Sequence, residues 1–184
     1  MWPATVRGVP WARHEPAVSP YRPDLVECWI FRVTGTGAVE YLLIQRAADR
    51  IYPGLWQPVT GGLDPGERIP LAALREAAEE TGLGSGDIEA FFDLDQVGTF
   101  YAEDPDAVVT SVIFAIRVPP AWEPRLSNEH VGFAWVGQAE AEERSIWPPY
   151  RNSLALIERL VASPDTARWF ALDGDGRRLA RPPG

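Results

Sequence analysis

Acidic side chains are concentrated in the stretch GGLDPGERIPLAALREAAEETGL, which runs from Gly61 to Leu83. Three of them, Glu76, Glu79 and Glu80, fall within five consecutive positions of a segment that is expected to be helical. At the angular spacing of an α-helix these side chains lie on one face. Like charges three or four residues apart destabilise a helix by about 0.2–0.5 kcal/mol per pair, so helix stability does not account for the cluster.

Two kinds of surface carry such a cluster. A solvated acidic face is the commoner one. A site for a hard divalent cation is the alternative, because Mg²⁺ or Mn²⁺ binds carboxylate oxygens and keeps positions open for phosphate oxygens and water. The stretch contains no His or Cys, which disfavours zinc. In either case Leu71, Leu74 and Ala78 are expected to pack the opposite face of the helix against the core.

The residues that flank the helix favour the cation site. Gly61 and Gly62 open a loop that continues through residues 64–67, and glycines let the backbone approach an ion or a phosphate closely. Pro70 falls in the first helical turn, where its missing N–H costs nothing. Gly82 is placed to end the helix. The whole stretch is therefore organised as a loop that delivers carboxylates at a helix surface.

The stretch resembles the Nudix box, whose pattern is G-x5-E-x7-R-E-U-x-E-E-x-G-U with U an aliphatic residue. The matching positions are Gly61, Glu67, Arg75, Glu76, Ala77, Glu79, Glu80, Gly82 and Leu83. Ala77 is small for an aliphatic position, and Arg68 stands where many members carry a Ser or Thr cap. The resemblance implies an α/β fold, the Nudix α/β/α sandwich with a mixed β-sheet between helices, over residues 24–162.

The same resemblance implies a hydrolase that cleaves a nucleoside diphosphate linked to another group, with Mg²⁺ as cofactor and Mn²⁺ as a substitute. Glu76, Glu79 and Glu80 would hold the metal, with Glu80 as the core ligand and the Gly61 carbonyl completing the shell. Glu67 would be an outer ligand or an anchor between loop and helix.

Two further roles follow from the resemblance. Arg75 would orient Glu79 through a salt bridge. The general base would be Glu79 or Glu80 in the box, or Glu129 in the loop before GFAWV. For Glu129 an ordinary surface carboxylate remains the alternative.

The elements around the box are read from periodicity and turn residues. Residues 25–33 and 38–46 form an expected β-hairpin, residues 91–102 and 107–118 a second one, and LWQPVT and residues 132–136 single strands. Apolar residues recur at helical spacing after Pro148 and Pro149. The order β-β-β-α-β-β-β-α predicts a mixed sheet with helices on its faces. Residues 1–23 are expected to be a Pro-rich arm, and residues 163–184 a tail with a possible small hairpin.

Composition restricts the remaining choices. The net charge of −9 makes duplex nucleic acid a poor partner. No run reaches the length of about 18 apolar residues that a membrane span requires. The single Cys28 cannot form an internal disulfide, and the opening residues do not resemble a secretory signal, so we expect a cytoplasmic protein. No feature of the sequence specifies an oligomeric state.

The expected substrate is a small nucleotide or pterin polyphosphate. The segments LLIQRAADRIYPGLWQPVTGGLDPGE and SNEHVGFAWV resemble the branch that releases pyrophosphate from dihydroneopterin triphosphate or dNTPs. Tyr101 resembles a tyrosine of diadenosine polyphosphate hydrolases, and ADP-ribose is a further alternative.

The candidate substrate-binding residues are Arg46 for phosphate, Trp56 for a base or pterin, and Tyr101. For each the alternative is structural, a surface arginine at a strand end or a core aromatic. His130 receives no role. A non-catalytic nucleotide-binding module is the competing class, and retention of every carboxylate in the box disfavours it.

Overall fold

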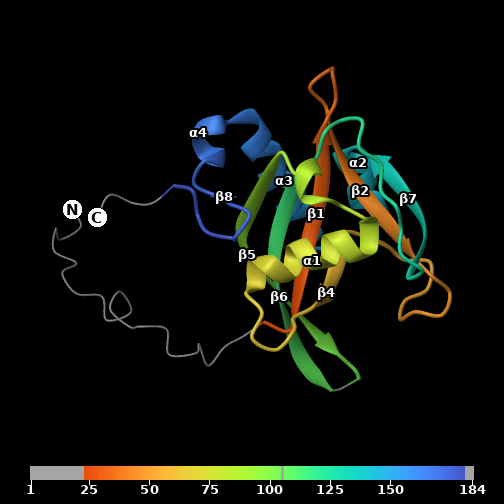
Figure 1. The fold of residues 1–184 in the computed structure, drawn as a ribbon. Coiled ribbons are helices and arrows are strands. Elements are labelled where there is room, and N and C mark those ends of the chain that lie inside the picture. The colour runs from red at the N-terminus through yellow and green to blue at the C-terminus, as the bar shows by residue number, and fades with distance from the viewer. Residues whose placement is uncertain (1–22, 105, 181–184) are drawn as a thin grey trace, which may run out of the picture.

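The computed structural model describes residues 23–104 and 106–180 (Figure 1). Its strands are β1 (Leu25–Val33), β2 (Val39–Arg46), β3 (Trp56–Gln57), β4 (Val59–Gly62), β5 (Ala90–Ala102), β6 (Ala107–Arg117), β7 (His130–Val136) and β8 (Ala171–Leu172). Its helices are α1 (Ile69–Thr81), the 3-10 turn η2 (Ser85–Asp87), α2 (Gln138–Arg144), α3 (Tyr150–Ala162) and α4 (Pro164–Ala167). The second half of the chain therefore contains α2, α4 and β8 in addition to the expected elements.

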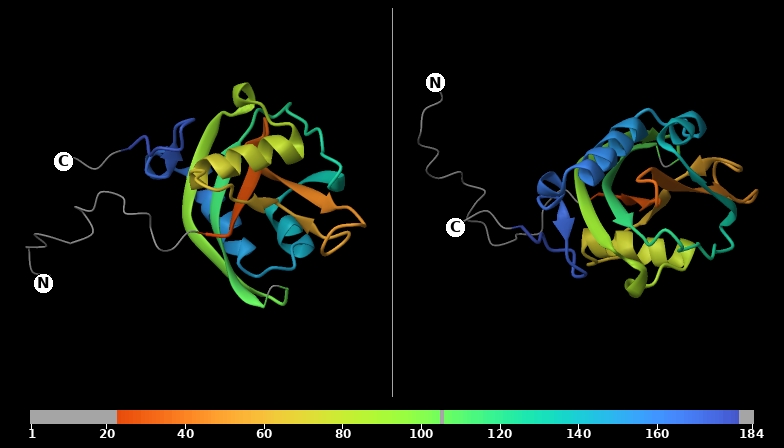
Figure 2. Two further views of the ribbon diagram at one scale, coloured as in Figure 1. Left: turned by 60° about the horizontal axis from the view of Figure 1, so that its bottom comes forward. Right: turned by 90° about the horizontal axis from the view of Figure 1, so that it is seen from above.

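All eight strands belong to one mixed sheet that lies between helices. The order is β3-β2-β1-β6-β5-β8, with β4 paired to β1 and β7 paired to β2. Only β1 and β6 run parallel, and the other pairs are antiparallel. Seen from above, α1 covers one face and α3 the other (Figure 2). This is the α/β/α sandwich that the motif implied.

One edge of β1 is shared by two strands. Its first half, Leu25–Cys28, pairs with β4, and its end, Phe31–Val33, pairs with β2. The expected single strand LWQPVT is accordingly wrong in detail, because the chain pairs with β2 before Pro58 and with β1 after it. Pro58 has no N–H to donate to a ladder, so it suits the point where the partner changes. Gly61 and Gly62 of the box thus lie on β4, opposite the start of β1.

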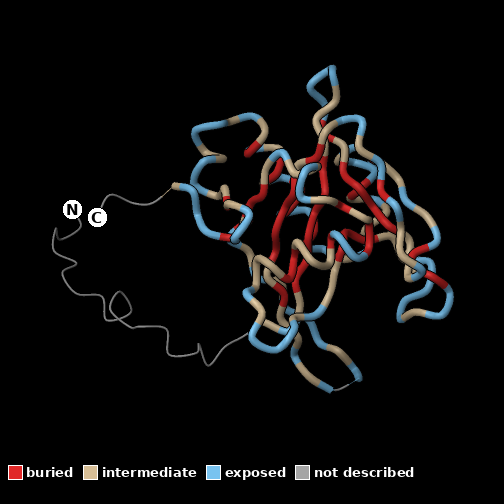
Figure 3. The backbone as a smooth tube through the Cα atoms, in the orientation of Figure 1, coloured by how far each residue is buried: buried red, intermediate tan, exposed pale blue. Residues whose placement is uncertain are grey.

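The sheet separates two apolar clusters, and the central strands are among the buried segments shown in Figure 3. Alternation along β1 assigns its side chains to the two faces: Cys28 and Ile30 face the α1 side, and Trp29 and Phe31 face the α3 side. Trp29 meets the ring of Tyr150 edge to face at 5.2 Å between centroids. Because successive side chains point to opposite faces, β1 contributes apolar residues to both clusters.

Helix α1 turns a different face to the sheet from the one its leucines suggested. Ala72, Ala73 and Ala77 are fully buried, whereas Ala78 is exposed and Leu71 and Leu74 are only partly buried. The expectation that Leu71, Leu74 and Ala78 form the core face is wrong for Ala78, which is exposed, and is met only in part by Leu74, which packs partly buried against the core. Small side chains allow the helix to approach the sheet closely, and this brings the carboxylate face inward instead of outward.

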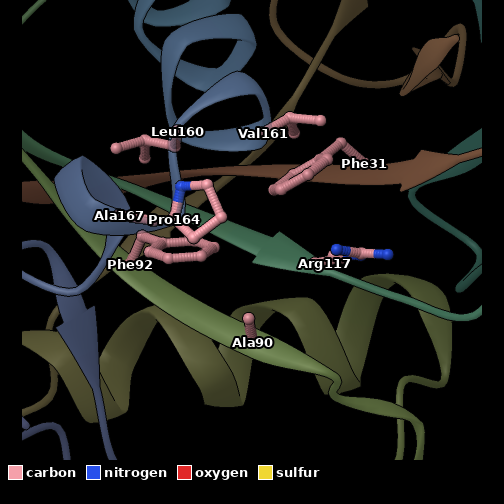
Figure 4. A pocket seen from close by; sticks show the side chains of 8 residues that line it. All are labelled: Phe31, Ala90, Phe92, Arg117, Leu160, Val161, Pro164 and Ala167. Carbon is pink, nitrogen blue, oxygen red and sulfur yellow. The ribbon is translucent and has the colours of Figure 1, made fainter. Parts of the chain in front are cut away.

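Helices α3 and α4 enclose a small apolar cavity on the opposite face of the sheet. Its volume is about 150 Å³, and Figure 4 shows the side chains around it. Phe31, Phe92 and Leu160 supply most of the apolar wall, and Arg117 lies at its edge, paired with Glu89 at 2.9 Å. The sheet separates this cavity from the carboxylates of α1.

The end of the chain is attached to both the sheet and α1. Strand β8 pairs with β5, and Leu172 forms a bridge with Arg178. The Arg68 guanidinium donates to the carbonyls of Asp175 and Gly176, which ties the tail to the start of α1. The predicted arm at residues 1–23 lies almost wholly outside the described residues. Within the described part of the chain, no helix has the length and apolar character needed to span a bilayer.

Candidate active site

Arg75 connects the loop of the box to its helix. Its Nε and Nη2 donate to the two carboxylate oxygens of Glu67, each at 3.0 Å, and Nη2 also donates to the Gly62 carbonyl at 2.8 Å. Nη1 donates to Glu76 at 2.7 Å and to Glu79 at 3.2 Å. The hydrogen bonds that Arg75 donates to Glu67 are the largest cause of its raised pKa, so the guanidinium stays charged. One cation thereby fixes three of the four glutamates.

Glu67 fixes the entry into α1. Besides the paired bonds from Arg75, its Oε2 accepts a hydrogen bond from the Asp64 backbone N–H at 3.1 Å. The N-cap residue, Arg68, makes no side-chain cap. The loop is therefore held by Glu67 and Arg75 where a Ser or Thr cap is missing, an arrangement that suits the anchoring role considered for Glu67.

The Gly61 backbone lies directly against the Glu76 carboxylate. A Cβ atom at Gly61 would stand 1.9 Å from Glu76 Cδ, whereas one at Gly62 would meet nothing within 4 Å. The Glu76 side chain is only 13% exposed, and burial raises its pKa. The first glycine of the box is thus required by the close approach of strand and helix, which brings backbone and carboxylate together.

Glu80 is the most buried carboxylate of the helix, with 6% exposure. Its Oε2 has no hydrogen-bond partner among the described residues. Burial, followed by the charges of Glu76 and Glu129, raises its pKa to about 8, while Arg46 and the Thr60 backbone N–H lower it. A buried oxygen without a donor is costly, and a cation would remove that cost.

Glu129 is brought to this cluster by the loop after β6. Within that loop the Arg125 and Ser127 N–H groups donate to the last carbonyls of α1, on Thr81 and Glu80, at 2.7 and 3.0 Å. The Glu129 carbonyl accepts from Ala47 N–H at 2.9 Å, and its side chain pairs with Arg50 at 3.3 Å. The loop thus joins the end of the helix to the end of β2, and Glu129 lies close enough to affect the Glu80 pKa.

The candidate substrate-binding residues occupy three different places. Arg46, at the end of β2, lies near Glu80, and its Nε donates to the Ile51 carbonyl at 2.6 Å. Trp56 is partly buried on the α3 side, with the Arg144 guanidinium 5.0 Å from its ring. Tyr101 is 63% exposed on the β5–β6 hairpin, where its hydroxyl donates to Asp106 at 2.8 Å. Only Arg46 joins the carboxylates, and the alternative of a core position for Tyr101 is wrong.

The four box glutamates and Glu129 are near one another but not yet arranged as ligands. In the described ranges no three His, Cys, Asp or Glu side chains are gathered at the spacing of a metal site. Arg75 draws Glu76 and Glu79 towards itself, and Glu79 remains 60% exposed. The pairing of Glu76 and Glu79 with Arg75 therefore directs these two carboxylates to the guanidinium.

Two buried polar residues received no role from sequence. Glu27, on β1, is 6% exposed and accepts a hydrogen bond from Trp29 Nε1 at 2.7 Å, and its burial raises its pKa to about 7. His130, on β7, pairs with Arg46 across the strands. The sequence signal for Glu27 was an acidic residue inside the apolar run LVECWIFRV. The signal for His130 was its position next to Glu129.

Comparison with known proteins gives a family match over most of the chain. The NUDIX domain matches residues 23–157. An octanoyltransferase of Myxococcus xanthus is 37% identical over 123 residues, which are 66% of this chain and 32% of that protein. The chain thus spans only about a third of that relative. An asymmetrical bis(5'-nucleosyl)-tetraphosphatase of Mus musculus is 33% identical over 103 residues, 56% of this chain and 67% of that protein.

Two further matches cover nearly all of the related protein. A nucleoside triphosphatase NudI of Escherichia fergusonii is 30% identical over 121 residues, 63% of this chain and 86% of that protein. A crystal structure of a C. elegans Ap4A hydrolase binary complex has a TM-score of 0.64 at 23% identity, covering 77% of this chain and 98% of that one. The structural likeness shows a shared fold.

Proposed function

The chain belongs to the Nudix hydrolase family, and from this premise we propose that it is a pyrophosphohydrolase dependent on a divalent metal ion. The proposed reaction cleaves a diphosphate linkage in a nucleoside triphosphate or a pterin triphosphate and releases pyrophosphate. The observation that carries the proposal is the buried Glu80 carboxylate, whose Oε2 lacks a donor, beside Glu76 and the Gly61 backbone. The similarity to a nucleoside triphosphatase supports the choice of substrate class.

The donor set suits a hard cation. The groups at the site are carboxylate and carbonyl oxygens of Gly61, Glu76, Glu79 and Glu80, and Mg²⁺ or Mn²⁺ prefers such ligands. Glu67 accepts two hydrogen bonds from Arg75, which in turn holds Glu76 and Glu79. When bound, the cation supplies positive charge that offsets the phosphate oxygens and favours ionisation of water. Mg²⁺ is proposed as the cofactor, with Mn²⁺ as a substitute.

The remaining residues divide the work of binding and proton transfer. Arg46 presents a guanidinium beside the carboxylates, where a phosphate group needs a cation. Glu79, Glu80 and Glu129 are the candidates to accept the proton of the attacking water. Glu→Gln at each position distinguishes a base from a ligand, because loss of the base lowers kcat with metal affinity retained, whereas loss of a ligand lowers metal affinity as well.

The substrate class is tested by product analysis. The protein is incubated with Mg²⁺ and, separately, dNTPs, dihydroneopterin triphosphate, ADP-ribose and diadenosine tetraphosphate. We expect pyrophosphate from one of the triphosphates. Glu80→Gln should abolish turnover with the fold retained, and Glu103→Gln, an exposed carboxylate on the β5–β6 hairpin, should not change it. Substantial activity of Glu80→Gln would remove Glu80 from the core of the mechanism.

A second candidate substrate is a diadenosine polyphosphate. The similarity to the mouse bis(5'-nucleosyl)-tetraphosphatase favours it. Its products would contain ATP and AMP instead of pyrophosphate, so the same panel separates the two. Binding of nucleotides without release of any phosphate, under either metal, would instead indicate the non-catalytic class.

A further inference from the structure

His130 is the first residue of β7 and lies across from Arg46, the last residue of β2. The register of this strand pair shifts between Gln45 and Arg46, so the two side chains stand at an irregular point of the ladder. The backbone N–H of His130 donates to the Ser127 carbonyl at 3.4 Å, which fixes the backbone at the end of the Glu129 loop. The position of the ring is therefore set by the two segments that carry Arg46 and Glu129.

The ring is buried without any hydrogen bond. His130 is 6% exposed, and neither Nδ1 nor Nε2 has a partner among the described residues. Buried polar groups in native proteins almost always have partners, and an unmade hydrogen bond costs free energy. Two unmet nitrogens on one ring therefore indicate a group that binds something from outside the chain.

The charged residues around the ring indicate which kind of ligand it could bind. Burial is the main cause that lowers the pKa of His130, with the charges of Arg46 and Arg50 acting in the same direction and Glu129 in the opposite one. The neutral ring offers one N–H donor. Arg46 and Glu129 also affect the pKa of Glu80, so His130 and Glu80 share both neighbours. A donor next to a guanidinium in the carboxylate cluster suits a phosphate oxygen.

We propose that His130 is a substrate-binding residue whose ring N–H donates a hydrogen bond to a non-bridging phosphate oxygen beside Arg46. The inference rests on the proposed function and adds a contact to it. The Arg46 guanidinium offsets the charge of the phosphate group. The His130 N–H orients one phosphate oxygen, since a hydrogen bond is strongest along the N–H axis. One of the two unpartnered ring nitrogens then gains a hydrogen-bond partner when substrate is present.

The chain contains only two histidines, so the ring can be observed directly. His14→Gln leaves His130 as the single source of imidazole signals in a ¹⁵N-histidine-labelled protein. Inorganic pyrophosphate with Mg²⁺ is the probe, and Mg²⁺ alone is the control. We expect a saturable shift of the His130 ring nitrogens with the probe and not with Mg²⁺ alone. Unchanged ring signals, while ³¹P spectra report bound pyrophosphate, would overturn the inference.

Steady-state kinetics separate binding from packing. His130→Phe fills the space of the ring without an N–H, and His130→Gln restores a donor. We expect His130→Phe to raise KM about tenfold with a smaller change in kcat, because one hydrogen bond to a charged group is lost, and His130→Gln to recover most of it. A folded His130→Phe protein with the KM of the His14→Gln reference would contradict the inference.

The failure of this inference differs from the failure of the proposed function. If the natural chain hydrolyses a triphosphate and the His130 ring signals do not shift when pyrophosphate binds, only the proposed role of His130 is lost. If no substrate of the panel is hydrolysed although Mg²⁺ and pyrophosphate bind and the ring signals shift, the contact stands and the catalytic proposal fails.

Discussion

The two helices that cover the sheet are held by different interactions. Helix α3 buries Leu154, Ile157 and Leu160 against the apolar face, whereas α1 buries alanines and turns Glu76 and Glu80 inward. Apolar area is what stabilises α3. Helix α1 is held in addition by hydrogen bonds and ion pairs, through Arg75 and the loop at its C-terminal end. The small apolar side chains of α1 leave room for buried carboxylates beside the core, whereas the contacts of α3 come from large aliphatic side chains.

The largest expected effect is the loss of packing under α3. Leu154→Ala should lower the free energy of unfolding by about 2–5 kcal/mol, because a fully buried side chain leaves a cavity. Urea denaturation measures this, and the kcat/KM of the folded protein should not change. Arg151→Ala, with a 71% exposed side chain on the same helix, should stay within about 0.5 kcal/mol of the natural chain. A loss of activity in folded Leu154→Ala would mean that the two faces are coupled.

Gly61→Ala, on the face of the sheet covered by α1, should instead lower activity more than stability. The added Cβ would overlap the Glu76 carboxyl group, and a displacement of about 1 Å at a site costs on the order of a hundredfold in rate. Gly62→Ala is the matched control, since its Cβ meets nothing within 4 Å. Mg²⁺ affinity by calorimetry and kcat/KM give the readout. Equal activities of the two variants would show that the contact between Gly61 and Glu76 is unimportant.

Arg75→Gln should affect activity more than stability. The Glu67, Glu76 and Glu79 carboxylates would lose their shared cation, and loss of such supporting contacts costs about tenfold or more in activity. The guanidinium is partly exposed, so we expect a change of only about 1 kcal/mol in stability. A thermal melt and kcat/KM on the same samples test this. A large loss of stability with unchanged kcat/KM would make Arg75 a purely structural residue.

The smallest effect concerns pH. The folded pKa of Glu80 is raised from its ordinary 4.5 to about 8, so the folded state keeps a proton that the unfolded state releases. Stability without metal should therefore fall as pH rises through that range. Glu80→Gln in EDTA should match the natural chain at the acid end and exceed it at the alkaline end. Glu27, with a pKa raised to about 7, should leave a residual slope. If the stability of the natural chain and of Glu80→Gln changed in parallel with pH, burial would not be raising the pKa of Glu80.

Local patterns predicted much of the fold. The strand alternation of β1 and β2, both hairpins, the start of α3 near Pro149 and the end of α1 at Gly82 all depend on contacts a few residues apart. The side of α1 that faces the sheet was not predictable in this way. Helical periodicity assigns leucines inward and carboxylates outward, whereas in the fold Ala72, Ala73 and Ala77 are buried against the sheet and Glu80 is buried with them.

The residues of the box and their spacing are fixed by the sequence, because helical geometry alone puts Glu76, Glu79 and Glu80 on one face. The sequence also fixes a charge and a composition that suit a small anionic ligand handled through a cation. Only the tertiary structure decided which of these carboxylates is buried, and that Arg46 and Glu129 approach it from two separate segments, the second of which also carries His130. Burial and convergence depend on how strands pair across the sheet, and the split edge of β1, where β4 replaces β2, is a long-range choice that no local pattern encodes.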